Sequence, residues 1–188
     1  MTVTVTPQVF NYVSFDAELI RSIAAGLLGA LGMSDHDVFI DVDETTPLAR
    51  ISCTIDKGLH IRAASGAFED TRKPRQQSET ATATSLGRVL LRARDRLVGG
   101  FGEAPADDDL TLAQVAAWET YCIGRLQRFG VPINQQRWRY NFRNRHGFSD
   151  ATDAAFELIW QSEGLTWGEL NAISETTAAS TTAASTVA

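Results

Sequence analysis

The chain has 188 residues, 17 Lys and Arg against 23 Asp and Glu, and a formal net charge of −6. Its 44% hydrophobic and 21% charged residues are typical of a globular domain and exclude globally disordered, collagen-like and disulfide-stapled classes. No apolar run approaches the roughly 18 residues of a membrane-spanning helix, and the start lacks the pattern of a secretory signal. Together with two widely spaced cysteines, Cys53 and Cys122, this predicts a cytoplasmic protein with reduced thiols and no membrane contact.

The first part of the chain carries the predicted strands. Residues 2–6 alternate between apolar and polar and end at Pro7, and residues 38–42 alternate in the same way. Between them, the apolar residues of 16–31 recur at helical spacing behind a capping residue, Ser14 or Asp16. Residues 50–55 and 59–63 predict two further strands joined by a hairpin turn at 56–58, in which Gly58 is free to take a positive φ. The polar stretch 64–78 predicts a loop.

The remaining elements are predicted to be helices. Apolar periodicity indicates helices over 79–97, 111–129 and 149–162, and a short last helix begins near residue 166. Thr111 and Gln114 have capping-box spacing. The Gly- and Asp-rich connector makes 99–110 a possible subdomain boundary.

These elements predict an α+β fold with a small antiparallel sheet of three to four short strands in the N-terminal half. About five helices, mostly C-terminal, pack with that sheet in a single domain over residues 1–173. Residues 174–188 lack periodicity and large side chains, so we expect a low-complexity, flexible tail there.

Positive charge is concentrated in the middle of the chain. Residues 1–60 hold 8 acidic and 3 basic side chains, residues 61–150 hold 10 acidic and 14 basic, and residues 151–188 hold 5 acidic and none basic. All basic residues except Lys57 and Lys73 are arginine, which binds carboxylates and phosphates through a planar fork, although a GC-rich genome also favours arginine. Such segregation favours association between copies or docking on a partner.

The strongest candidate binding segment is 135–148, in which arginines alternate with aromatic residues and no acid occurs. Either a helix or a strand here presents an aromatic surface beside an arginine surface, which suits an acidic protein, a nucleic acid or another anion. The structural alternative is that the aromatic side chains are core and the arginines pair with the acidic helix at 150–163. The candidate binding residues of this segment are Arg137, Trp138, Arg139, Tyr140, Arg143, Arg145 and His146.

A second candidate is the arginine stripe on the helix predicted over 79–97. Arg88 and Arg92 are one helical turn apart, and Arg96 continues the row. These side chains either form a basic binding face or lie on a solvated helix face, paired with acids of the same chain.

One short motif has a known counterpart. The apolar strand at 38–42 is followed by Asp43-Glu44-Thr45, and the pattern Asp41-x-Asp43-x-Thr45 resembles the first motif of the haloacid-dehalogenase phosphatases. That resemblance implies Asp41 as nucleophile, Asp43 as acid/base and Mg²⁺ as the metal. It covers about eight residues, and the hairpin predicted at 50–63 departs from the family's parallel topology. An edge strand that ends in a solvated acidic turn is the alternative.

No other catalytic pattern occurs. The three histidines lack zinc-site spacing, and neither a phosphate-binding loop nor a nucleophile elbow is present. We therefore expect no catalytic residue, no metal and no cofactor, and a non-catalytic interaction or assembly subunit that binds a protein partner or a second copy. A nucleic-acid or anionic-ligand binding protein is the alternative, and an Mg²⁺-dependent phosphatase at Asp41 and Asp43 is the second alternative.

Overall fold

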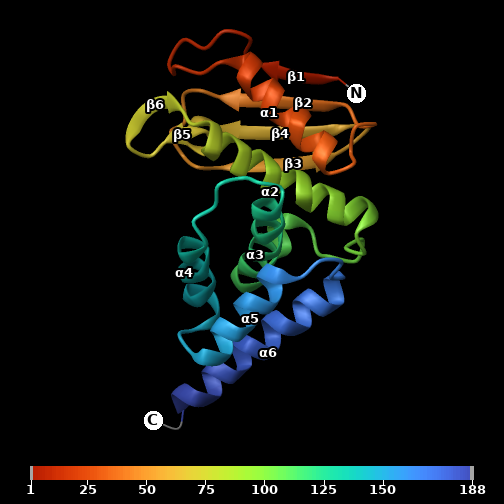
Figure 1. Ribbon diagram of the computed structural model, residues 1–188, viewed down its shortest axis with the longest axis vertical. Helices are drawn as coiled ribbons and strands as arrows, with labels where there is room; N and C mark the ends of the chain where they lie inside the picture. Colours follow the sequence, from red (N-terminus) through yellow and green to blue (C-terminus); the bar gives the residue numbers. More distant parts are fainter. Residues whose placement is uncertain (1, 187–188) are drawn as a thin grey trace. The chain divides into compact units, whose positions relative to one another are not determined.

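The computed structural model describes the backbone of residues 2–186 and the side chains of residues 2–178. The described residues form an α+β fold with a mixed four-stranded sheet and a small hairpin in the N-terminal part and six α-helices, most of them C-terminal (Figure 1). The chain divides into two compact units, Met1–Arg94 and Asp95–Ala188. The division falls inside a helix, ahead of the predicted boundary at 99–110.

The sheet of the first unit is mostly parallel. Its strands are β1 (Val3–Thr6), β2 (Val38–Asp43), β3 (Ile51–Ile55) and β4 (Leu59–Ala64), in the order β1-β2-β4-β3. β1 and β4 both run parallel to β2, and only β3 is antiparallel to its neighbour β4. The predicted antiparallel sheet is therefore wrong for two of the three pairings. The reason is that β1 and β2 are joined by a helix, a crossover that returns the chain in the same direction.

One face of this sheet is buried beneath two helices, α1 (Ala17–Ala30) and the first part of α2 (Glu79–Val98), which Figure 1 shows across the strands. Strand residues alternate accordingly: Val38, Ile40 and Val42 are buried, whereas the residues between them are exposed. The predicted helix start is confirmed, because the Asp16 side chain accepts a hydrogen bond from the backbone of Glu18. Arg94 Nε donates to the carbonyl oxygen of Leu31 at 2.9 Å, which ties α2 to the end of α1.

The two turns of this unit differ from their predictions in detail. The hairpin at 56–58 forms, but Lys57 has the positive φ, 50°, that we expected of Gly58. Gly58 is required for another reason: a Cβ there would lie 2.9 Å from the carbonyl oxygen of Asp37. The predicted loop 64–78 contains a 3-10 turn, Ser65–Ala67, and a hairpin of β5 (Glu69–Asp70) and β6 (Lys73–Gln77). The residues of this hairpin are polar and partly exposed. The segment therefore lacks the alternation of apolar and polar residues from which strands are predicted.

The second unit is helical. It contains the end of α2, a 3-10 turn at Asp107–Asp109, and the helices α3 (Leu112–Arg128), α4 (Gln135–His146), α5 (Asp150–Gln161) and α6 (Trp167–Thr186). The predicted capping box at Thr111 and Gln114 is confirmed. At Gly124 helices α3 and α5 approach so closely that a Cβ would lie 2.3 Å from the carbonyl oxygen of Trp160. The largest fully buried side chains of this unit are Trp118, Trp160, Tyr121, Phe101, Phe142 and Phe156.

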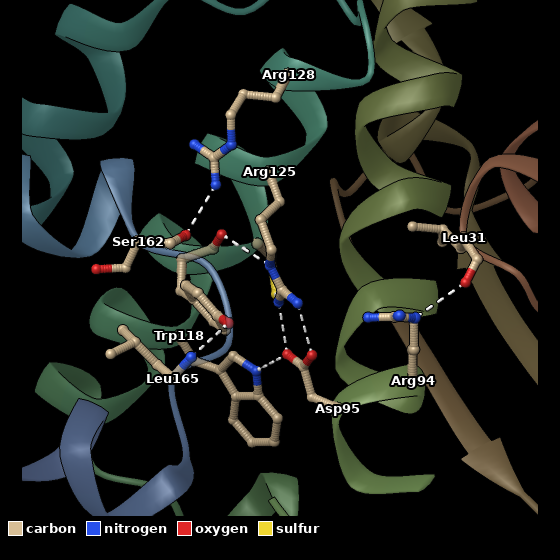
Figure 2. A network of polar contacts seen from close by, with 10 residues as sticks. Leu31, Arg94, Asp95, Trp118, Arg125, Arg128, Ser162 and Leu165 are labelled. Carbon is tan, nitrogen blue, oxygen red and sulfur yellow. Dashed lines mark hydrogen bonds and ion pairs between the residues drawn. The ribbon is translucent and has the colours of Figure 1, made fainter. Parts of the chain in front are cut away.

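A buried ion pair crosses this core (Figure 2). The Asp95 carboxylate accepts hydrogen bonds from Arg125 Nη1 at 2.7 Å, from Arg125 Nη2 at 2.6 Å and from Trp118 Nε1 at 2.8 Å. The guanidinium also lies 3.7 Å from the ring centroid of Tyr121. Burial alone would lower the pKa of Arg125, but its hydrogen bonds to Asp95 and its charge interactions with Cys122, Asp95 and Tyr121 together outweigh that effect and raise it. Both side chains are therefore paired and hydrogen-bonded inside the unit.

The C-terminal segment is more structured than its composition suggests. Helix α6 continues to Thr186, and both Ser174 and Thr177 are buried. The Ser174 hydroxyl lies 2.8 Å from Nε2 of His146 on α4. The segment expected to be a flexible tail therefore packs against the helical unit at its start. Residues 187 and 188 lie outside the described part.

Candidate functional site

The arginine- and aromatic-rich segment 135–148 forms helix α4, which decides between the helix and the strand that the sequence left open. Asn134 precedes the helix, and its side chain accepts a hydrogen bond from the backbone of Arg137 at 3.2 Å. Gly147, at φ 92°, ends it in a conformation that disfavours other residues. The residues that define the candidate site therefore follow helical periodicity, with separate inner and outer faces.

The inner face of α4 belongs to the core. Phe142 is fully buried, and His146 is 1% exposed, with the two rings stacked at a centroid distance of 3.9 Å. His146 Nδ1 lies 3.1 Å from the Phe142 carbonyl oxygen. Burial lowers the pKa of His146, which favours the neutral form of the ring. His146, a predicted binding residue, is thus inaccessible to a partner on the surface.

Two of the four arginines pair with acids of α5, as the structural alternative expected. Arg143 Nε donates to Asp153 Oδ1 at 2.7 Å, and a second hydrogen bond joins Arg143 Nη2 to Asp153 Oδ2. This bidentate contact lowers the pKa of Asp153 and raises that of Arg143. Arg139 pairs with Glu157, and its guanidinium carbon lies 5.2 Å from the ring centroid of Phe156. These arginines attach α4 to α5, and their charge is largely neutralised there.

The other two arginines are exposed. Arg137 and Arg145 lie two helical turns apart on one face, and within the described residues neither guanidinium forms an ion pair. Tyr140 and Phe148, 58% and 63% exposed, contact each other edge to face at a centroid distance of 5.9 Å. We call this set the outer α4 surface, and its members are Arg137, Tyr140, Asn141, Asn144, Arg145 and Phe148.

Sequence reasoning found part of this surface and missed part. It named Arg137, Tyr140 and Arg145, but it omitted Phe148, whose position directly after the helix-ending Gly147 was a usable signal. Trp138, which it also named, is half-buried. The sequence did not indicate that Asn141 and Asn144 belong to this surface, because their exposure depends on how α4 is rotated about its axis.

The second predicted arginine group is divided between the units, with Arg88 and Arg92 in the first and Arg96 in the second. Arg88 and Arg92 on α2 are both half-buried, and both are already engaged in interactions within the chain. Because α2 buries residues such as Leu86, Val89 and Leu90, the neighbouring arginines lie at the border of an apolar face. Of the two alternatives for this helix, the half-burial of Arg88 and Arg92 and their interactions within the chain favour pairing inside the chain over a freely exposed basic face.

The phosphatase-like motif lies on the exposed face of the sheet. Asp41 is in the middle of β2, one residue from the buried Ile40, and is exposed. Asp43 accepts hydrogen bonds from the backbone and the hydroxyl of Thr45, at 2.9 Å and 2.6 Å. The Thr45 and Thr46 hydrogen bonds lower the pKa of Asp43 to about 2. Within the described residues, no group of three or more His, Cys, Asp or Glu side chains is arranged to hold a metal ion.

Comparison with known proteins identifies no relative: no family model, curated protein or solved structure is significantly similar to this chain. Across the described residues, no helix combines the length and the apolar character needed to cross a membrane.

Proposed function

We propose that the outer α4 surface docks an acidic protein surface and that the chain is a non-catalytic interaction or assembly subunit. One observation carries this proposal: Arg137 and Arg145 are exposed and lack an ion-pair partner among the described residues, on a helix whose other two arginines are neutralised. An exposed aromatic pair, Tyr140 and Phe148, adjoins them on the same surface.

The composition of this surface supports a protein partner. Arginine, tyrosine and phenylalanine are enriched in the cores of protein interfaces, where they supply most of the binding energy. Helix α4 contains no acidic residue, so the two exposed guanidinium groups create a local positive charge on a chain of net charge −6. A second copy of the chain is one candidate partner, because Asp108 and Asp109, in the 3-10 turn Asp107–Asp109, offer exposed carboxylates of opposite sign.

A nucleic acid is the alternative partner, since aromatic rings beside arginines also suit stacked bases and phosphates. The helical unit argues against it, because it holds 12 acidic residues and only 7 basic ones, which would repel a polyanion. The phosphatase proposal at Asp41 and Asp43 has the weakest support, since Asp43 already accepts two hydrogen bonds from Thr45. The cytoplasm remains the proposed compartment, in keeping with two free thiols, Cys53 and Cys122.

The test compares a double variant, Arg137→Ala with Arg145→Ala, with a control, Arg72→Ala, whose side chain is 91% exposed in the other unit. Binding to fluorescent polyglutamate and to a single-stranded DNA oligomer is measured at several salt concentrations. We expect the wild type to bind polyglutamate, the control to match it, and the double variant to bind at least several-fold more weakly with a smaller salt dependence.

The melting temperature separates a binding role from a structural one. Because Arg137 and Arg145 lack ion pairs among the described residues, we expect the double variant to melt within a degree or two of the wild type. Unchanged polyglutamate binding together with lowered melting would make these arginines structural. Binding of DNA in preference to polyglutamate would replace the proposal with the nucleic-acid alternative.

A further inference from the structure

A pocket of about 400 Å³ lies in the first unit, at the edge of the sheet where the parallel strands end. Segments that follow β1, β2 and β4 line it, together with the β5–β6 hairpin. In open α/β sheets, ligand sites form outside the carboxyl ends of the strands. The volume is within the usual range for small-molecule sites.

The wall of this pocket is held together by hydrogen bonds that backbone N–H groups donate. Glu44 Oε2 accepts from the backbone N–H groups of Asn11 and Tyr12 at 2.7 Å and 2.6 Å, which joins the segment after β1 to the segment after β2. The backbone N–H of Ser14 donates to the carbonyl oxygen of Arg75 at 2.8 Å, which joins the first of these segments to β6. These hydrogen bonds therefore fix the lining segments relative to one another.

A glycine closes the remaining side. A Cβ on Gly66 would lie 2.5 Å from the carbonyl oxygen of Pro47, so only glycine lets the turn after β4 lie against the segment after β2. Next to it, Ser65 is 1% exposed, and its hydroxyl donates to Glu69 Oε1 at 2.8 Å. This contact orients the Glu69 carboxylate at the pocket.

Two carboxylates give the pocket its charge. Glu44 and Glu69 both line it, and within the described residues neither forms an ion pair. Their hydrogen-bond donors are neutral: backbone N–H groups for Glu44, and the Ser65 hydroxyl with the backbone N–H of Arg75 for Glu69. Arg75 is the one basic residue in the lining, so the lining residues carry an excess of one negative charge.

The rest of the lining is apolar. Val13, Pro47 and Pro74 offer hydrocarbon surface, and Tyr12, 63% exposed, is the aromatic residue of the lining. A ring face beside carboxylates attracts a cation that carries hydrocarbon. A divalent metal fits less well, because no third His, Cys, Asp or Glu among the described residues completes a ligand group.

From this geometry we propose that the pocket binds a small organic cation, an ammonium or guanidinium group on an apolar stem. The cationic head lies between Glu44 and Glu69, and the stem packs against Tyr12 and the two prolines. This site is independent of the outer α4 surface, so either proposal can fail without the other.

The test uses n-butylguanidinium as the probe and n-butylurea as its uncharged isostere. Titration calorimetry on the full chain measures affinity, and the amide chemical shifts of Ser65 and Tyr12 locate the site. We expect butylguanidinium to bind at least roughly tenfold more tightly than butylurea, because charge-assisted hydrogen bonds distinguish the two.

Three variants separate the contributions. The double variant Glu44→Gln with Glu69→Gln should lose this preference, whereas the control Glu79→Gln, an exposed glutamate at the start of α2, should retain it. Tyr12→Ala keeps both carboxylates and should weaken binding several-fold without unfolding the unit, since its ring is exposed. Equal affinity for the two probes, shift changes away from Ser65 and Tyr12, or full binding by the double glutamine variant would each overturn the proposal.

Discussion

Replacing Arg125 by methionine tests how the helical unit tolerates its buried charges. The substitution keeps much of the side-chain volume but removes two short charged hydrogen bonds to Asp95 and the contact with the Tyr121 ring. Asp95 would retain Trp118 Nε1 as its side-chain donor, in a site where it is 1% exposed. Leaving such a carboxylate without its counter-ion costs about 3–5 kcal/mol of unfolding free energy.

The assay is urea unfolding followed by tryptophan fluorescence, because all four tryptophans, at 118, 138, 160 and 167, belong to this unit. A shift of the midpoint without a change of slope reports a change of stability. The matched double variant, Arg125→Met with Asp95→Asn, removes both charges, keeps a polar group facing Trp118 and should recover a large part of the loss. A loss below about 1 kcal/mol for Arg125→Met, or no recovery in the double variant, would refute this account of the ion pair.

Four further changes have defined outcomes in the same fluorescence assay. Gly124→Ala should cost about 1–3 kcal/mol, because its Cβ would collide with the backbone of Trp160, and a neutral result would show that α3 and α5 can separate freely. Thr111→Ala should cost about 1 kcal/mol through the lost cap, less than the glycine substitution. Burial lowers the pKa of His146 below its ordinary 6.5, so the unfolded chain takes up the proton first and stability should fall as the pH drops below 6.5; His146→Gln should flatten that part of the pH profile. A chain ending at residue 173 should melt several degrees lower than the full chain, because it lacks two buried hydroxyl side chains of α6.

Local chemistry made several elements predictable. The cap at Asp16, the capping box at Thr111 and the turn at 56–58 each depend on residues within a few positions of one another, and all three form. Sheet direction depends on pairing between distant strands, and our prediction gave weight to the hairpin at 50–63 over the strand–helix–strand pattern at 2–42. That pattern already indicated the parallel pairing of β1 with β2.

The sequence predicted only in outline which α4 arginines pair within the chain and which are exposed. The sequence identified the acidic helix at 150–163 as a source of internal partners. Which arginines pair depends on the rotation of α4 about its axis, which the burial of Phe142 decides. The same rotation buries His146 against the hydroxyl of Ser174. Apolar periodicity does not predict this contact, because both side chains are polar.

The central claim is that the outer α4 surface contacts an acidic protein, and cross-linking from Asn141 tests it most directly. Asn141 is exposed and lies one helical turn from both Arg137 and Arg145, so a photoreactive amino acid there reports on what touches the surface. Cross-linking is performed in intact cells, and the lysate is then treated with nuclease. We predict a cross-link to one acidic protein or to a second copy of the chain. That cross-link should disappear in the Arg137→Ala, Arg145→Ala variant and should not form from a control site at Asp56. Identical cross-links from both sites, cross-links that survive the double variant, or cross-links to nucleic acid alone would contradict the claim.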